Sequence, residues 1–465
     1  MNNPRIMLAA GSSGSGKTLL TCGILQALLN RGIKAVSFKC GPDYIDPMFH
    51  SRVLGTKSRN LDTYFTDEET TRYLFCRTAV GADISVIEGV MGYYDGLGGS
   101  TVRASAYDLA RVTDTPVVLI VNCKGMSLSS LACVKGYMDY KKDSRIKGVI
   151  FNQMSEALYQ RIKGQAEEEL GISCLGCVPV MKDMGLESRH LGLVMPDEIE
   201  GLRENLRKLA DVLEKTLDLE GLLRLAGSAG SIEGQAPAGE RKLFSEEEGP
   251  VIAVARDEAF CFLYEDNLEL LRRMGAKIRF FSPLWDDRMP RADGLLLYGG
   301  YPELHAAKLS GNSSMRESIG SAIRGGMPCM AECGGFMYLH REMEDMEGKS
   351  WPMAGIIPGK AYRTKKLNRF GYISLRPDKE QMLGLDVGEI RAHEFHYFDS
   401  TACGDAFRAG KPVGNRSWDC IWGTKSLIAG FPHLYYYSNP EAAGRFLQTC
   451  AAFRAGKRED LTRDE

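Results

Sequence analysis

Short apolar runs alternate with helix-sized segments through the first half of the chain. Alternation of this kind predicts βαβ units built around a mostly parallel sheet. A helical pattern of apolar residues then follows over 202–225. The runs with the length and composition of buried strands are 6–10, 35–39, 84–88, 116–122, 147–152 and 175–180.

A change in composition separates this half from the next. Residues 226–249 are rich in Gly, Ser, Ala, Pro and Glu, which predicts a linker. A fresh α/β pattern follows it, so we predict two doubly wound α/β domains. The later strand patterns are 251–255, 277–282, 293–298, 327–331 and 426–431, and the helical ones are 267–274 and 319–324. The predicted boundaries are 1–225, linker 226–249, 250–455 and a charged tail 456–465.

Composition narrows the class of protein. The 465 residues exceed one ordinary core, and the formal net charge of −2 gives no overall field that would attract nucleic acid. The sequence contains no apolar stretch long enough to cross a bilayer, and its first residues lead directly into a strand. We therefore expect no membrane or nucleic-acid partner and a cytoplasmic location. The oligomeric state stays open, a homo-oligomer included.

Thirteen cysteines are scattered along the chain. An odd number without paired CxxC units predicts reduced thiols. Cys174 and Cys177 are the one close pair, and we interpret them as buried thiols on a strand because no second pair or histidine stands nearby.

The first predicted strand runs into a phosphate-binding loop. Residues 11–18 fit the strand–GxxxxGK[ST]–helix pattern without a mismatch. Glycine at 11, 14 and 16 (Gly11, Gly14, Gly16) lets the backbone curl so that its N–H groups point at phosphate oxygens. Lys17 is predicted to bridge the terminal phosphates of ATP, and the Thr18 hydroxyl to ligate Mg²⁺.

Charged side chains follow neighbouring strands near this loop. Asp43 comes after the second strand and Glu88 ends the third, where parallel strands face the phosphate crevice, so both are candidate Mg²⁺ ligands. Lys39 also ends a strand and is predicted to neutralise an acyl phosphate or a substrate carboxylate. Asp46 fits a metal role and the capping of a turn equally well. Asn152 is a candidate contact to the nucleotide base.

The second half contains a pattern typical of a nucleophile. Residues 327–339 read as strand, sharp turn and helix, with Cys333 at the turn and Gly334 behind it. We expect the helix N-terminus to lower the pKa of this thiol. A glycine turn at Gly300 is suited to presenting backbone N–H groups to an oxyanion. His433, after a strand-like run, is the candidate base.

Two further histidines stand three residues apart. The spacing of His393 and His396 is compatible with a metal site. Because no third ligand is evident, we favour a strand or loop that faces substrate.

Taken in order, these motifs resemble one known family, the cobyrinic acid a,c-diamide synthases of corrinoid biosynthesis. The resemblance spans about residues 5–450 and implies a P-loop domain like that of dethiobiotin synthetase, followed by a class I, triad-type glutamine amidotransferase domain. The segments that carry it are 11–18, 41–47, 88–92, 299–303, 332–335 and 393–397.

For the second domain, the resemblance implies that Cys333 accepts the γ-glutamyl group of L-glutamine and that His433 activates it. Gly300 and Gly334 are then expected to supply the oxyanion N–H groups. The sequence departs from the wider triad pattern in two places. Tyr435 stands where those enzymes have a glutamate, and Glu332 precedes the nucleophile in place of a small residue.

For the first domain, the resemblance implies that Thr18, Asp43 and Glu88 hold Mg²⁺ or orient an acyl phosphate. ATP would phosphorylate a peripheral carboxylate of a tetrapyrrole, and ammonia from glutamine would displace the phosphate. The alternatives are another tetrapyrrole, such as nickel sirohydrochlorin or hydrogenobyrinic acid, and the reaction of a cobyric acid synthase. The missing acid after His433 motivates a third, a non-catalytic ATP-dependent switch.

Overall fold

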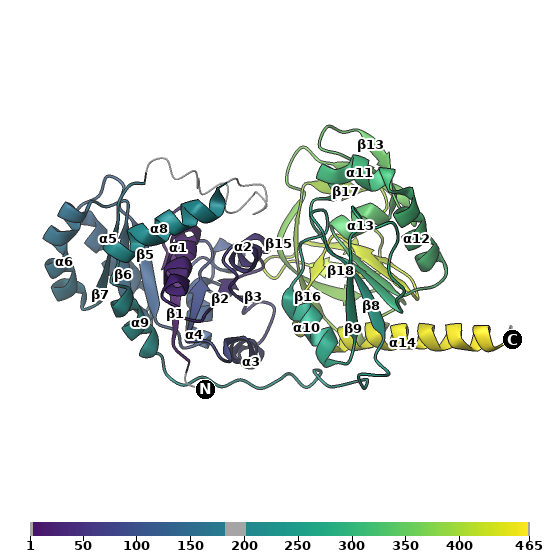
Figure 1. Ribbon diagram of the computed structural model, residues 1–465, viewed down its shortest axis with the longest axis horizontal. Helices are drawn as coiled ribbons and strands as arrows, with labels where there is room; N and C mark the ends of the chain where they lie inside the picture. Colours follow the sequence, from purple (N-terminus) through teal and green to yellow (C-terminus); the bar gives the residue numbers. More distant parts are fainter. Residues whose placement is uncertain (1–2, 182–200, 464–465) are drawn as a thin grey trace. The chain divides into compact units, whose positions relative to one another are not determined.

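The chain folds as two compact units in a computed structural model that describes residues 3–181 and 201–463 (Figure 1). The units are Met1–Ala236 and Pro237–Glu465. Residues 228–249, all of them described, contain turns but no helix or strand. No helix in the described part of the chain is long and apolar enough to cross a membrane.

The first unit is built on a seven-stranded sheet in which every neighbouring pair is parallel. Six of its strands were predicted. The seventh, β3, has the polar sequence Ser-Arg-Asn-Leu and lies at the edge of the sheet, so no apolar run marks it. In order across the sheet, the strands are β3 (Ser58–Leu61), β2 (Ala35–Cys40), β4 (Ile84–Glu88), β1 (Arg5–Ala10), β5 (Val117–Asn122), β6 (Ile146–Asn152) and β7 (Ser173–Val178).

Eight described α-helices accompany this sheet. They are α1 (Lys17–Asn30), α2 (Ile45–Arg52), α3 (Glu68–Ala79), α4 (Ala106–Val112), α5 (Ser129–Tyr140), α6 (Glu156–Leu170), α8 (Leu202–Thr216) and α9 (Leu219–Gly227). Helices α1 and α8 approach closely at Gly23, where an added methyl group would lie 2.8 Å from Leu209. The tight packing anchors the helix that carries the phosphate-binding residues.

The helical pattern predicted over 202–225 is two helices. Asp218 separates α8 from α9, and its side chain accepts a hydrogen bond from the N–H of Gly221 at the start of α9. The backbone N–H of Asp218 donates to Leu175 on β7. A capping aspartate thus outweighs the continuous apolar periodicity on either side of it.

The second unit contains a six-stranded central sheet that is parallel except at β20. In order, its strands are β20 (Trp422–Gly423), β21 (Leu427–Gly430), β11 (Cys329–Glu332), β10 (Gly294–Leu297), β8 (Val251–Ala255) and β9 (Lys277–Phe281). Its α-helices are α10 (Glu265–Arg273), α11 (Ala306–Gly311), α12 (Ser313–Arg324), α13 (Gly334–Leu339) and α14 (Pro440–Arg463). Helix α14 continues through most of the segment predicted as a tail.

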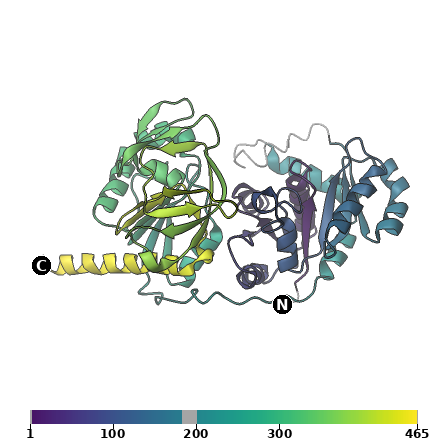
Figure 2. The same cartoon turned by 180° about the vertical axis from the view of Figure 1, so that it is seen from behind.

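Two smaller sheets, largely antiparallel, were not predicted and belong to the same unit (Figure 2). The first contains β13 (Ser350–Pro352), β12 (His340–Glu344), β14 (Ile357–Arg363) and β17 (Phe398–Ser400). The second contains β19 (Ser417–Cys420), β18 (Phe407–Gly410), β15 (Arg369–Pro377), β16 (Ile390–His396) and β22 (His433–Leu434). Pairing of β22 with β16 fixes His433 opposite His393.

Candidate active sites

The phosphate-binding loop joins β1 to α1 in the predicted place. Gly14 and Gly16 have φ values of 76° and 91°, in the left-handed region that favours glycine. Asn152, at the end of β6, donates its side-chain amide to the carbonyl of Ser15 at 2.9 Å. An added methyl group on Gly16 would lie 2.5 Å from that amide. Asn152 therefore holds the backbone of the loop through Ser15, while its contact to a nucleotide base stays a prediction.

Lys17 is directed into the curl of the loop. Its ammonium donates to the carbonyl of Ser12 at 2.9 Å and to that of Met91 at 2.6 Å. Burial, reinforced by the positive charge of Lys39, lowers the pKa of Lys17 to about 8. A bound phosphate would raise this pKa again, because an anion beside an ammonium favours protonation.

Four side chains from β2, β4, α1 and α2 meet beside the loop. The Thr18 hydroxyl donates to Oε1 of Glu88 at 2.6 Å, and the Lys39 ammonium donates to the same oxygen at 2.8 Å. Lys39 also contacts Oδ2 of Asp46 at 2.5 Å. Burial alone would lower the pKa of Lys39, yet Asp46 and Glu88 hold it well above its ordinary value. The structure thus brings Thr18, Lys39 and Glu88 together as predicted.

Asp43 lies at the margin of this group. Its carboxylate accepts a hydrogen bond from the N–H of Ile45 at 2.8 Å, in the manner of a turn cap. Burial, with the neighbouring Asp46 carboxylate, raises the pKa of Asp43 to about 6. Burial, with Glu88, does the same for Asp46. Asp46 is the carboxylate that contacts Lys39, and its place on the first turn of α2 was the signal for this role.

His50 was missed by the sequence analysis. It is fully buried on α2, four residues after Asp46, and its Nε2 lies 3.5 Å from Oε2 of Glu88. Burial lowers the pKa of His50 to about 3, so its ring is neutral. Oε2 of Glu88 is buried and has no hydrogen-bond partner among the described residues. An orphaned carboxylate oxygen beside a hydroxyl fits a hard cation such as Mg²⁺.

The cysteine turn of the second unit has the geometry of a nucleophile elbow. Cys333 stands between β11 and α13 with φ 45° and ψ −103°, a strained conformation for a residue with a side chain. Its N–H donates to the carbonyl of Gly430 at 2.8 Å, which ties the turn to β21. Backbone strain held in place by hydrogen bonds is characteristic of a functional turn.

Gly299 brings the nucleophile and the base to one place. A methyl group added to Gly299 would lie 3.3 Å from Cβ of Cys333 and would clash with the ring of His433. The two predicted partners therefore flank the same glycine. Nearby, a methyl group added to Gly334 would lie 3.1 Å from the backbone N of Gly300, so the two predicted oxyanion positions are adjacent.

The electrostatics of this site correct one prediction. Burial raises the pKa of the Cys333 thiol, and the Glu303 carboxylate adds to the increase. The N–H of Gly334, at the start of α13, does lower this pKa, but burial outweighs it, so the expected net lowering is wrong. Burial, with the nearby His393 and His396, lowers the pKa of His433 to about 3. The resting pair is a neutral thiol beside a neutral imidazole that is ready to accept a proton.

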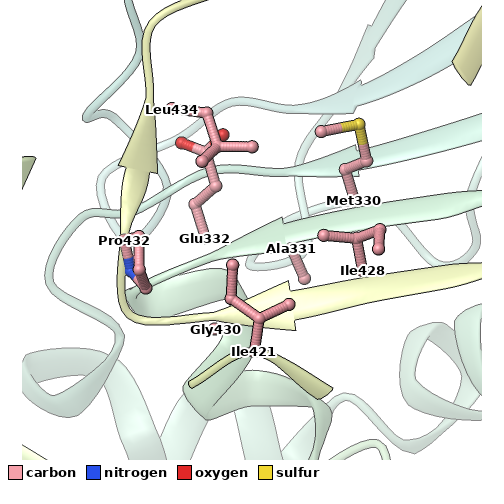
Figure 3. Close-up of a pocket in the computed structure, with 8 residues that line it drawn as sticks. All are labelled: Met330, Ala331, Glu332, Ile421, Ile428, Gly430, Pro432 and Leu434. Carbon is pink, nitrogen blue, oxygen red and sulfur yellow. The ribbon is translucent and has the colours of Figure 1, made fainter. Parts of the chain in front are cut away.

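A carboxylate also reaches His433. Oε2 of Glu332 lies 3.9 Å from Nδ1 of the imidazole. Its side chain lines a small pocket together with other residues of β11 and β21 and with Pro432 and Leu434 (Figure 3). The sequence contained a signal for it, since Glu332 stands where a small residue is common.

The remaining candidate ligands serve packing. His396 stacks on Phe431 with ring centres 4.0 Å apart, and its Nδ1 lies 2.6 Å from the carbonyl of Phe398. Cys174 and Cys177 are buried on β7, as predicted. No group of three or more His, Cys, Asp or Glu residues placed to hold a metal occurs within 3–181 or 201–463.

Gly299→Ala tests the shared position of nucleophile and base. We expect kcat for glutamine hydrolysis to fall by about 100-fold, because the methyl group displaces His433 from Cys333. Release of glutamate by the purified chain measures the effect. Gly311→Ala is the matched control, since no atom lies within 4 Å of its added methyl group. Equal activity of the two variants would contradict the geometry.

Comparison with known proteins identifies the two domains that hold these sites. Residues 6–193 match the family model described as the CobQ/CobB/MinD/ParA nucleotide binding domain. Residues 251–439 match the CobB/CobQ-like glutamine amidotransferase domain. The chain is therefore an amidating ligase that couples a nucleotide-binding domain to a glutamine amidotransferase domain, and the predicted fold class is confirmed.

The whole chain, as well as each domain, has close relatives. It belongs to the cobyrinate a,c-diamide synthase family, as the motifs indicated. The protein of that name from Listeria innocua is 39% identical over 460 residues, covering 98% of this chain and 100% of the relative. The one from Caldanaerobacter subterraneus is 39% identical over 455 residues, covering 97% and 99%. The one from Picrophilus torridus is 37% identical over 448 residues, covering 96% and 98%.

Proposed function

We propose that this chain amidates the a and c carboxylates of cobyrinic acid, using ATP and ammonia from L-glutamine. The main support is that one chain contains two sites. In one, Thr18 of the P-loop is hydrogen-bonded to the buried Glu88, and in the other a strained cysteine lies beside a neutral histidine. The tetrapyrrole and its two carboxylates are those in the name that its relatives carry, cobyrinate a,c-diamide synthase.

Glutamine is hydrolysed at Cys333. His433 takes the proton from Sγ, and the sulfur attacks the γ-amide carbon of glutamine. The N–H groups of Gly300 and Gly334 stabilise the oxyanion. The imidazolium returns its proton to the leaving nitrogen, so ammonia departs and a thioester remains. Water then hydrolyses the thioester to glutamate and restores the thiol.

The carboxylate is activated in the first unit. A carboxylate oxygen of the tetrapyrrole attacks the γ-phosphorus of ATP and ADP leaves, giving an acyl phosphate. Lys17 and the loop N–H groups hold the phosphates. Thr18 and Glu88, joined by Asp46 or Asp43, would hold Mg²⁺, which neutralises phosphate charge when bound. Lys39 lies within this group, where its charge favours the negative acyl phosphate. Ammonia attacks the acyl carbon and phosphate leaves.

Product analysis tests this proposal. The full chain is incubated with ATP, Mg²⁺ and glutamine and, in parallel, with cobyrinic acid, hydrogenobyrinic acid or nickel sirohydrochlorin. We expect the diamide of cobyrinic acid by mass spectrometry, with ADP and glutamate released in step. A diamide of another ring alone would change the substrate. No amide and no ADP with any ring would contradict the proposed reaction.

A further inference from the structure

The nucleophile elbow contains a buried acid to which the proposed reaction assigns no role. Glu332 is the last residue of β11 and directly precedes Cys333, with only 4% of its surface exposed. Figure 3 shows its side chain extending from the strand toward Leu434. Burying a carboxyl group is costly unless it is partnered, so its place beside the nucleophile calls for an explanation.

The carboxylate of Glu332 lies beside the ring of the candidate base. Oε2 lies 3.9 Å from Nδ1 of His433, and the N–H of Leu434 donates a hydrogen bond to the same carboxylate. The acid is thereby tied to the residue that follows His433. Its other oxygen, Oε1, is buried without a hydrogen-bond partner in the described part of the chain, which leaves an acceptor at the site.

The position two residues after the histidine, where related enzymes have the acid, holds a buried tyrosine that packs in the core. Tyr435 is 2% exposed, and its ring meets that of Tyr264 edge to face at 5.1 Å. Glu394 is another buried acid of the region, but its Oε1 lies 4.0 Å from Nε2 of His396. Glu394 therefore faces a different histidine.

We propose that Glu332 is the positioning acid of His433. A rotation that closes the 3.9 Å separation would let its carboxylate accept a hydrogen bond from Nδ1–H, which leaves Nε2 unprotonated and able to take the proton of Cys333. One proton moves from Sγ to Nε2, and Glu332 stays ionised while it stabilises the imidazolium. This role rests on the proposed function only in that glutamine is hydrolysed at Cys333.

A dependence on pH follows from this arrangement. Burial raises the pKa of Glu332 well above its ordinary value, and the N–H of Leu434 opposes the increase. Below that pKa the carboxyl is protonated and carries no charge to stabilise the imidazolium of His433, so glutaminase activity falls on the acid side. Other titratable groups facing the site are His393, His396 and Glu394 on β16, Glu303 after β10, Tyr298 after β10, and Tyr436.

Glu332→Gln in the full chain tests the proposal, with glutamate release from glutamine measured across pH and no tetrapyrrole present. We expect kcat to fall by on the order of 100-fold or more, while KM for glutamine changes by less than about threefold. The acid limb of the wild-type pH profile is expected to disappear. Glu344→Gln, which changes a carboxylate paired with Lys360, controls for the substitution.

Three results would overturn the assignment. The first is a kcat of Glu332→Gln within about threefold of the wild-type kcat. The second is an unchanged acid limb in the pH profile of Glu332→Gln. The third is loss of that limb in Glu394→Gln only. If Glu332→Gln loses its cooperative unfolding transition, Glu332→Asp decides, since a displaced acid limb supports the role and an unchanged one overturns it. A wild-type chain that releases no glutamate would contradict the proposed function itself. That result differs from the three above, in which the wild type is active and only the role of Glu332 fails.

Discussion

Cys333→Ala is expected to abolish amidation supported by glutamine while amidation supported by ammonia continues. Removal of the sulfur leaves no atom to form the thioester, so the glutamine-dependent rate should fall by on the order of 10⁴-fold or more. Ammonia added to the solution bypasses that step. Amide formation with each nitrogen source, measured at the same ATP and tetrapyrrole concentrations, checks the prediction.

Cys329→Ala is the matched control. Cys329 is also a buried, free cysteine of β11, and it lies four residues before the nucleophile. Its replacement should leave both activities within a few-fold of wild type, since no step uses it. Amidation by neither nitrogen source in any variant or in the wild type would favour the non-catalytic switch.

Lys17→Met is expected to have the complementary effect. Loss of the ammonium that is directed into the loop should lower amidation with either nitrogen source by about 10² to 10³-fold, because the phosphate charge in the transition state is no longer met. Glutamate release should persist, since Cys333 and His433 are untouched. Measurement of ADP and glutamate in the same samples separates the two half-reactions.

Lys34→Met is the control for this change. Lys34 is exposed and directly precedes β2, at the end of that strand opposite to Lys39. ADP formation by Lys17→Met at the wild-type rate would contradict the assignment of the P-loop as the ATP site. Loss of glutamate release in Lys17→Met would instead show that nucleotide binding controls the glutaminase.

The central strands of the two parallel sheets were predictable because they are buried on both faces and are therefore continuous apolar runs. The phosphate loop and the elbow were predictable because glycine marks the turns that each requires. The two smaller sheets were not, since their strands alternate polar and apolar residues weakly and pair over long distances. On β15, for example, Arg369 pairs with His396 and Leu375 with Ile390.

Within the sites, sequence identified residues by chemical type but could not assign roles that depend on contacts. Asp46 fitted two roles equally well and His50 was missed, until α2 placed them against Lys39 and Glu88. The pKa of Cys333 shows the same limit. A helix after the cysteine predicts a lowered pKa, whereas the depth of burial, which sequence does not give, raises it.

The protonated state of Cys333 has a consequence for the chain when no glutamine is present. Oxidants and alkylating reagents attack the thiolate and react poorly with a buried thiol. Because 7% of its surface is exposed and its pKa is raised, Cys333 is protected from these reagents when no glutamine is bound. Proton transfer to His433 then generates the reactive thiolate only when the amide of glutamine is bound beside it. The burial that shapes the site therefore also keeps the free thiol unreactive.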